Sequence, residues 1–305
     1  MNDKPDAKRD VRGIVLLDKP VGISSNAALQ RVKRLYRARK AGHSGSLDPL
    51  AGGMLPITLG EATKMAGFVL EADKVYWTRV KLGTVTTTGD AEGTVVATRA
   101  VQPVAEERLR EVLKAFTGPI DQIPPMHSAI KRNGQPLYKL AHKGLEVERP
   151  PRRVVINDIR LLRYEGDELD LEIDCSKGTY IRTLAEDIGN RLGFGGYVGS
   201  LRRLSIGPYR AAQMVTMEQL EAAERDGDQA LLGLLLPMES ALTHWPSVSL
   251  SDELAFFIRR GQPVAVSKAP KAKLVKLYSA RDSFLGVGRV MEDGRIAPRR
   301  LVNPQ

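Results

Sequence analysis

One acidic side chain in a glycine-rich stretch is the first candidate for chemistry. Asp48 lies in the segment GHSGSLDPLAGG, residues 42–53. Small residues on both sides let the backbone turn tightly, and Pro49 biases Asp48 toward an extended conformation. A carboxylate with an ordinary pKa of about 4 is ionised at neutral pH, so it can act as nucleophile or base without help. An Asp-Pro dipeptide is also an ordinary turn, in which the carboxylate binds its own backbone.

A second glycine turn, SKGTYIR at residues 176–182, supplies a candidate partner cation. Burying a carboxylate is costly unless a cation accompanies it, and the Arg182 guanidinium offers a permanently charged, bidentate clamp. Arg182 could equally be a surface residue at a helix start. The helix dipole disfavours a positive charge there, which favours a specific role.

Other catalytic and metal-binding patterns are missing from the sequence. There is no Gly-x-Ser-x-Gly segment and no glycine loop followed by Lys-Ser/Thr, so serine hydrolase and P-loop chemistry are not indicated. A pair of glycosidase carboxylates is not excluded, because spacing in the chain does not set spacing in space. The four histidines are scattered without ligand spacing, so we expect no metal.

Two tyrosines follow the charged or glycine-rich segments. Tyr76 comes after Lys74-Val75, and Tyr180 comes after Gly178-Thr179. An aromatic side chain beside a basic groove can stack on a nucleobase, whereas a half-buried structural tyrosine is the more ordinary interpretation. By default, Leu201 is a core residue and His43 a loop histidine.

The composition favours an anionic partner and a reducing compartment. The 305 residues carry a formal net charge of +10, and the pI is about 9.7. Nucleic acid is the commonest partner of so basic a chain. A single cysteine rules out an intramolecular disulfide, and the first dozen residues lack the apolar core of a signal peptide. The sequence therefore predicts a cytoplasmic protein with no membrane partner.

A basic helix is expected to begin near Ser24, Ser25 and Asn26, which are good N-caps. Leu29, Val32 and Tyr36 recur at helical spacing, while the rest of the segment is rich in Arg and Lys, with no acid from residue 27 to 40. A solvated helix normally interleaves acids. The pattern fits either a face toward phosphates or a solvated surface.

The remaining pattern predicts a mixed α+β protein. Expected helices cover residues 61–70, 106–116, 137–142, 181–192 and 252–260, and Thr216 with Gln219 forms a capping box for another. Expected strands cover residues 13–17, 75–82, 94–97, 154–162, 168–175, 274–278 and 284–289, with 75–82 and 94–97 as an antiparallel pair.

The domain organisation follows from composition and punctuation. We expect a disordered tail at residues 1–12, a catalytic domain at 13–245 and a small β-rich domain at 246–305. Residues 124–151 are rich in Pro, Gly, Lys and Arg, and they are predicted to form a mobile insertion that closes on a ligand.

Several blocks, in order along the chain, together resemble the TruB family of bacterial tRNA pseudouridine synthases. They are LDKP at 17–20, GHSGSLDPLA at 42–51, KVY at 74–76, CSKGTYIR at 175–182 and LRR at 201–203, and the match runs from about residue 12 to 301. The resemblance implies a bent, mainly antiparallel sheet flanked by helices, followed by a small PUA-like RNA-binding domain. It also implies conversion of uridine 55 in the tRNA T loop to pseudouridine, without metal or organic cofactor, by a protein we expect to be a monomer.

The resemblance further implies roles for individual residues. Asp48 would be the nucleophile and Arg182 its partner. His43 would insert where the flipped base leaves the loop stack, Tyr76 would stack on the target base, and Tyr180 with Leu201 would line the pocket. Lys19 and the insertion 124–151 would hold the RNA. Whether Asp48 adds to the sugar carbon or first removes a sugar proton stays open, as does the role of Tyr76 as base or stacking partner.

A few positions depart from the family pattern. Ser44, Ser46 and Gly52 stand where Thr, Ala and Thr are more usual, and His127 stands where Tyr is more common. Two other functions stay open. The first is a non-catalytic RNA-binding or tRNA-folding protein, although RNA binding alone would not require the Asp48 carboxylate. The second is the same chemistry on a T-loop mimic in another RNA.

Overall fold

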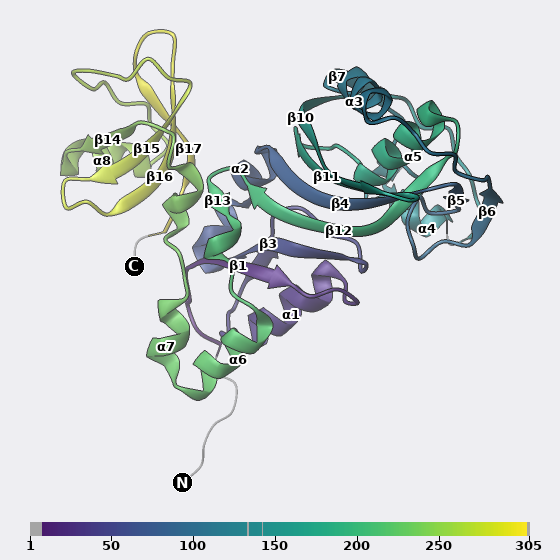
Figure 1. The fold of residues 1–305 in the computed structure, drawn as a ribbon. Helices are drawn as coiled ribbons and strands as arrows, with labels where there is room; N and C mark the ends of the chain where they lie inside the picture. The colour runs from purple at the N-terminus through teal and green to yellow at the C-terminus, as the bar shows by residue number, and fades with distance from the viewer. Residues whose placement is uncertain (1–7, 133, 142, 304–305) are drawn as a thin grey trace. The chain divides into compact units, whose positions relative to one another are not determined.

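The computed structural model describes residues 8–132, 134–141 and 143–303 (Figure 1). The chain divides into two compact units. The first unit comprises Met1–Leu47, Met54–Glu71 and Gly207–Gln305, and the second comprises Asp48–Gly53 and Ala72–Ile206. The 245/246 boundary predicted from composition is not a boundary of these units.

The predicted disordered tail is too long at its C-terminal end. Residues 1–7 lie outside the described residues, but Arg9 is ordered: its backbone N–H donates to the Arg37 carbonyl at 2.7 Å, and its guanidinium pairs with Asp228 at 2.5 Å. Val11 is buried. An apolar anchor and an ion pair therefore hold this stretch in the first unit.

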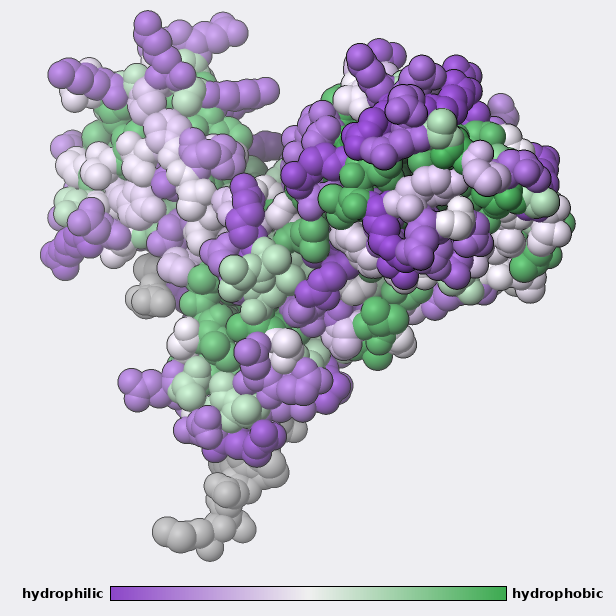
Figure 2. All heavy atoms as spheres, in the orientation of Figure 1, coloured by the Kyte–Doolittle hydropathy of each residue, from purple (hydrophilic) through white to green (hydrophobic). Residues whose placement is uncertain are grey.

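The second unit is built on a sheet with the strand order β12 (Gly196–Ile206), β4 (Lys74–Leu82), β11 (Glu168–Cys175), β10 (Arg152–Glu165) and β7 (Gly118–Gln122). All these neighbours pair antiparallel. Burial alternates residue by residue along β4, as expected for a strand with one face on a core. The helices α3 (Glu106–Ala115) and α5 (Ile181–Leu192) pack together, with α3 against β10 and α5 against β12. Hydrophilic residues cover much of the visible surface around α3 and β10 (Figure 2).

One predicted strand pair is wrong. Residues 75–82 do not pair with 94–97, because β4 lies between β12 and β11. Instead β6 (Val95–Thr98) forms a separate two-stranded hairpin with β5 (Thr84–Thr86). Every residue of β6 is exposed, so this segment has no buried face with which to extend the central sheet.

A fully buried strand, β3 (Ala51–Leu59), follows Asp48 directly, where no strand was predicted. In the second unit its first residues pair in parallel with β12, so that Gly53 lies opposite Arg203. Gly53 has a φ of +93°, and a Cβ there would lie 2.3 Å from the Arg203 carbonyl oxygen. Only glycine permits this approach of the two backbones.

In the first unit, β1 (Gly13–Lys19) and β2 (Ala41–His43) both pair with β3. The helix α1 (Ser25–Leu35) begins as predicted, with Ser24 as its N-cap accepting from the Ala27 N–H. The predicted capping box of Thr216 and Gln219 opens α6 (Met217–Arg225), which is followed by α7 (Asp228–Gly233). The predicted helix at 61–70 is a short 3-10 helix, η1 (Gly60–Lys64), and then α2 (Ala66–Glu71).

The basic face of α1 is partly neutralised within its own unit. Arg31 pairs with Glu221 of α6, and Arg37, just after α1, pairs with Asp228 of α7 at 3.0 Å. These acids are distant in sequence, so inspection of residues 27–40 alone could not reveal them.

The C-terminal part of the first unit has a sheet and a core of its own. The strands β14 (Ser247–Leu250), β15 (Leu274–Ser279), β16 (Phe284–Val290) and β17 (Ile296–Leu301) form one sheet in that order, accompanied by α8 (Asp252–Arg259). Val275, Leu277 and Ile296 are among the residues of its hydrophobic cluster. The expected small β-rich segment is therefore present.

The predicted insertion is a region of short elements. A two-stranded hairpin of β8 (Lys131–Arg132) and β9 (Gln135–Pro136) leads into α4 (Leu137–Ala141). His142, the predicted last residue of that helix, lies outside the described residues.

The remaining short elements are β13 (Tyr209–Arg210), η2 (Ala211–Gln213) and η3 (Met238–Leu242). Within the described residues, no helix combines the length and apolar character needed to cross a bilayer.

Candidate active site

Asp48 and Arg182 form an ion pair in the second unit. The Arg182 Nη2 atom lies 3.0 Å from Asp48 Oδ2. The two partners differ in exposure: the Arg182 side chain is 7% exposed, whereas that of Asp48 is 40% exposed. The turn at Asp48 is closed by its own carbonyl, which accepts from the Ala51 N–H at 3.0 Å. The carboxylate is thus held from its buried side and remains accessible from the other.

The Arg182 guanidinium is fixed by three further groups. It lies 3.4 Å from the Asp90 carboxylate and donates to the backbone carbonyls of Thr88 at 3.2 Å and His127 at 2.7 Å. Asp90 is itself buried, and it accepts from the Glu92 N–H. Two carboxylates compensate for the cost of a cation in the first turn of α5, where the helix dipole opposes it. The contact with His127 O also ties the insertion to this ion pair.

Tyr76 is buried in β4 and faces Arg203 of β12. The two residues are register partners, and the Arg203 guanidinium carbon lies 6.0 Å from the centroid of the tyrosine ring. Burial raises the pKa of the Tyr76 hydroxyl, the nearby Arg203 opposes that shift, and the Asp48 carboxylate adds a smaller raising effect. The hydroxyl is therefore a neutral phenol at neutral pH.

Tyr180 is the N-cap residue of α5 and is held by its backbone. Gln122, at the end of β7, accepts from the Tyr180 N–H at 3.0 Å and donates to the Tyr180 carbonyl at 3.2 Å. Gln122 is buried, so this reciprocal pair gives both the oxygen and the nitrogen of its amide a partner away from water. Burial raises the pKa of the Tyr180 hydroxyl, and Asp48 adds to the shift.

Leu201 is 9% exposed and lies in the middle of β12. Its register partners are Ala51 in β3 and Thr78 in β4. Ala51 is the residue whose N–H closes the turn at Asp48, so Leu201 is placed next to that turn.

The two remaining candidates lie in the first unit. His43 is the last residue of β2, half-buried and paired with Ile57 of β3. Lys19 has no exposed surface, and its ammonium donates to the carbonyls of Pro20 at 2.8 Å and Ile23 at 2.7 Å. So complete a burial is at odds with the expected direct grip on RNA, because a phosphate cannot reach the ammonium. Lys19 instead braces the turn between β1 and α1.

Sequence reasoning assigned no role to three residues that shape the site: Asp90, Gln122 and Arg203. Asp90 lies in a turn that is recognisable from its Thr and Gly residues, but its burial depends on Arg182, which is far away in sequence. Gln122 lies two residues before the predicted insertion, and Arg203 belongs to the LRR block. Within the described ranges, no group of three histidine, cysteine or acidic residues could hold a metal ion.

Comparisons with known proteins identify the family. The model of the TruB family pseudouridylate synthase N-terminal domain matches residues 33–181, that of the tRNA pseudouridylate synthase B C-terminal domain matches 182–243, and that of the pseudouridine synthase II TruB C-terminal region matches 246–302. The chain is 54% identical to tRNA pseudouridine synthase B of Nitrosococcus oceani, over 97% of this chain and 96% of the relative. It is 53% identical to the protein of the same name from Pseudomonas fluorescens Pf-5, over 98% of each.

The chain belongs to the TruB family of pseudouridylate synthases.

Solved structures agree with the TruB fold. The chain is similar to one in a crystal structure of a Cbf5-Nop10-Gar1 complex, with a TM-score of 0.73, 26% identity and coverage of 96% of this chain and 84% of that one. It is equally similar to a chain of an archaeal box H/ACA Nop10-Cbf5 complex, at 25% identity, with coverage of 96% and 86%. The predicted fold class is confirmed: this chain is a mixed α+β protein with a mainly antiparallel sheet and a C-terminal domain of the TruB family.

Proposed function

We propose that this TruB family chain isomerises uridine 55 in the T loop of tRNA to pseudouridine, with Asp48 as the nucleophile. Its relatives named above are tRNA pseudouridine synthases B, and the alignment with them spans nearly the whole chain. The observation that carries the proposal is the Asp48–Arg182 pair: a carboxylate that is fixed on one side by a buried cation and accessible on the other.

The reaction explains why such a carboxylate is needed. The N1–C1′ glycosidic bond of uridine breaks, the uracil rotates, and a new bond joins C5 to C1′. The proton on C5 is released and N1 takes up a proton, so the product is an isomer of the substrate. Asp48 either adds to the sugar carbon or removes a sugar proton, and both routes require an accessible carboxylate whose position is held. Arg182 provides that position through its contacts with Asp90 and with two backbone carbonyls.

The base has to leave its stack before any of this can occur. A uridine within a stacked loop is inaccessible, and extruding it costs a few kcal/mol. We propose that His43 fills the vacated place, that Tyr76 stacks on the extruded base, and that Tyr180 and Leu201 line the pocket. Leu201 lies beside the Asp48 turn, and the Asp48 carboxylate contributes to the raised pKa of the Tyr180 hydroxyl. Both observations support these roles.

The insertion 124–151 holds the RNA, and its link to Arg182 through His127 O couples that grip to the catalytic pair. Lys19 supports the turn 18–23. Residues 13–245 form the catalytic domain and 246–305 a PUA-like RNA-binding domain. One chain supplies every proposed residue, so a monomer in the cytoplasm is sufficient, with no metal or organic cofactor.

The test replaces the carboxylate while keeping its shape. We expect Asp48→Asn to abolish tritium release from [5-³H]uridine-labelled tRNA and to leave tRNA binding within about tenfold, because shape and most phosphate contacts are kept. Asp158→Asn, in the exposed part of β10, is the matched control and should retain full turnover. Normal turnover by Asp48→Asn would refute the nucleophile. Absence of turnover by the unmodified protein would favour the non-catalytic RNA-binding alternative.

A further inference from the structure

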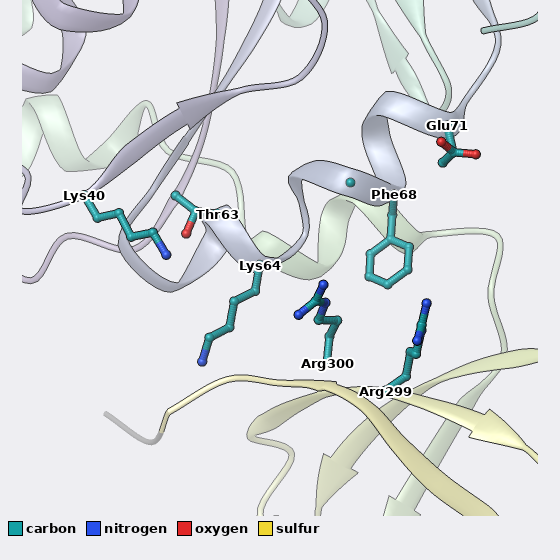
Figure 3. Close-up of a pocket in the computed structure, with 8 residues that line it drawn as sticks. Lys40, Thr63, Lys64, Phe68, Glu71, Arg299 and Arg300 are labelled. Atoms are coloured by element: carbon teal, nitrogen blue, oxygen red, sulfur yellow. The ribbon is translucent and has the colours of Figure 1, made fainter. Parts of the chain in front are cut away.

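The first unit contains an open cavity of about 440 Å³ that the proposed reaction does not use (Figure 3). Its walls come from η1, α2 and β17, together with the residue just before β2. The lining residues are Lys40, Thr63, Lys64, Gly67, Phe68, Glu71, Arg299 and Arg300. None of them belongs to the proposed active site. Specific small-ligand sites have volumes of roughly 300–1,000 Å³, so the cavity could hold a single nucleotide.

Positive charge dominates the lining. Four of the residues are cations and one, Glu71, is an acid, and Figure 3 shows the Glu71 carboxylate turned away from the cations. Lys64 is paired with Glu61 at 2.7 Å. Within the part of the chain that the structure describes, no carboxylate pairs with Lys40, Arg299 or Arg300. Three uncompensated cations around one hollow attract an anion, and paired guanidinium groups suit the geometry of a phosphate.

An aromatic ring lies among these cations. Phe68 of α2 is half-buried, and Figure 3 shows its ring directed into the cavity near Arg299 and Arg300. Trp245 supports it in an edge-to-face contact, with ring centroids 5.0 Å apart. A supported ring beside arginines is suited to stacking on an unpaired base. Such stacking does not depend on which of the four bases is present, because each has a π-face.

The walls of the cavity are fastened to each other. Asn303, just after β17, donates its backbone N–H to Glu61 of η1 at 2.6 Å, and its carbonyl accepts from Arg12 at 2.8 Å. These bonds keep the strand that carries Arg299 and Arg300 close to η1 and α2. Two walls of the cavity are therefore joined by the protein's own hydrogen bonds.

We propose that this cavity binds one unpaired nucleotide of the RNA substrate outside the T loop. Arg299, Arg300 and Lys40 hold its phosphate, and Phe68 stacks on its base. The inference rests on the proposed function for the identity of the RNA. In an isolated T-arm hairpin the unpaired bases are those of the loop, which the Asp48 site takes. The cavity should therefore add affinity only for RNA that extends beyond that hairpin.

The test compares two RNAs, a full-length tRNA transcript and the isolated T-arm hairpin, by filter binding over a series of KCl concentrations. We expect the double variant Arg299→Ala/Arg300→Ala to weaken full-length binding about tenfold and to lower its salt slope by about one phosphate contact. Phe68→Leu should weaken full-length binding by about fivefold or more without changing the slope. In both variants the ratio of hairpin to full-length Kd should fall. Arg225→Ala removes an exposed arginine at the end of α6, in the same unit but outside the cavity; it is the matched control and should change neither value.

Three results would overturn the inference: unchanged full-length affinity in both variants, an equal loss for both RNAs, or tight binding of AMP that full-length tRNA does not displace. The last result would assign the cavity to a free mononucleotide. A protein that shows the expected ratios but no tritium release would leave the cavity in place and refute the proposed function instead.

Discussion

At the scale of single residues, the arrangement around Arg182 separates two tasks between two carboxylates. Asp90 is buried and serves the guanidinium, whereas Asp48 shares the same guanidinium and remains accessible. Because Arg182 is also held by carbonyls of Thr88 and His127, it cannot follow Asp48 if that side chain moves. The cation therefore sets the direction of the nucleophile.

Tyr76 provides a prediction at this scale. Burial raises the pKa of its hydroxyl above the ordinary value near 10, so lowering the pH from 9 to 6 leaves it protonated throughout. We expect log kcat/KM of the unmodified protein to show no ionisation of Tyr76 across that range. Tyr76→Phe should retain more turnover than Tyr76→Leu, because the phenyl ring still stacks on the base and the leucine does not.

The measurement is tritium release from tRNA under single-turnover conditions for both variants. Tyr164→Phe controls for the loss of a hydroxyl outside the site: Tyr164 is a half-buried residue of β10 whose hydroxyl accepts from the Val104 N–H at 3.1 Å. Equal loss in Tyr76→Phe and Tyr76→Leu would show that the hydroxyl itself takes part in the chemistry, and stacking alone would then be the wrong account.

At the scale of elements, the sequence predicts a helix or strand correctly where neighbouring residues determine it. The prediction fails where the element depends on partners that are distant in sequence. The ends of α1 and α6 follow from Ser24 and the Thr216–Gln219 box, which act within one turn. β3 was missed because both of its faces are buried, which removes the alternating pattern, and because Gly52, Gly53 and Pro56 usually mark loops. Likewise, Asp48 and Arg182 could be singled out by type, but Asp90 and Gln122 act through contacts that no local pattern encodes.

Gly53 gives a direct test of the approach between β3 and β12. We expect Gly53→Ala to lower the free energy of unfolding by about 2–4 kcal/mol, because both the positive φ and the clash with Arg203 O oppose a Cβ. Gly166→Ala is the matched control, since its φ is +61° but nothing lies within 4 Å of its Cβ position. It should cost about 1 kcal/mol, from backbone strain alone.

Urea denaturation gives the free energy of unfolding of both variants. The difference between them separates the cost of the clash from the cost of backbone strain. If Gly53→Ala were no more destabilising than Gly166→Ala, the backbones of β3 and β12 would have room to separate, and the tight contact would be unnecessary for the fold.

Gln122 tests how β7 positions α5. In Gln122→Leu the N–H of Tyr180 loses its acceptor, whereas the Tyr180 carbonyl keeps the Leu184 N–H as a donor at 3.0 Å. The one unsatisfied group costs about 1–3 kcal/mol. We expect turnover to fall and the KM for tRNA to rise, because Tyr180 and Arg182 lie on the same turn. Gln122→Glu keeps the acceptor but loses the donor, so it should show an intermediate KM.

The readout is the KM and kcat for tRNA, measured beside the thermal midpoint. Gln30→Leu, on the exposed side of α1, is the control for loss of an amide. A fall in the thermal midpoint with unchanged KM and kcat would show that Gln122 serves only stability and does not position the site.

At the scale of the whole molecule, the acid-free run of arginines and lysines at residues 27–40 overstates the charge that α1 offers to RNA. Arg31 and Arg37 are paired with acids of α6 and α7, whereas Arg34 is exposed and free of such a pair within the described residues. The domain boundaries show a similar limit. Composition changes near residue 245, but Asn303, just after β17, bonds to Glu61 and Arg12, which lie far away in sequence. Neither pairing is visible in a linear pattern.

Salt dependence tests this distribution of charge. We expect the affinity for full-length tRNA to fall steeply as KCl rises, because several phosphates are neutralised on binding. Arg34→Ala should lower the slope of log K against log[salt] by about 0.7–0.9, the value for one phosphate contact. Arg31→Ala should change it far less, because Glu221 already neutralises that cation. Equal slopes for Arg34→Ala and the unmodified protein would remove α1 from the RNA-binding surface.

The one cysteine has a practical consequence. Cys175 is buried at the end of β11, and burial raises its pKa to about 12. Maleimide dyes attack the thiolate, so at pH near 7 they will leave Cys175 unmodified. A cysteine introduced at an exposed position of α4, as in Lys139→Cys, would then be the sole reactive thiol. A fluorophore attached there could follow the insertion as RNA arrives, with no native thiol to remove first.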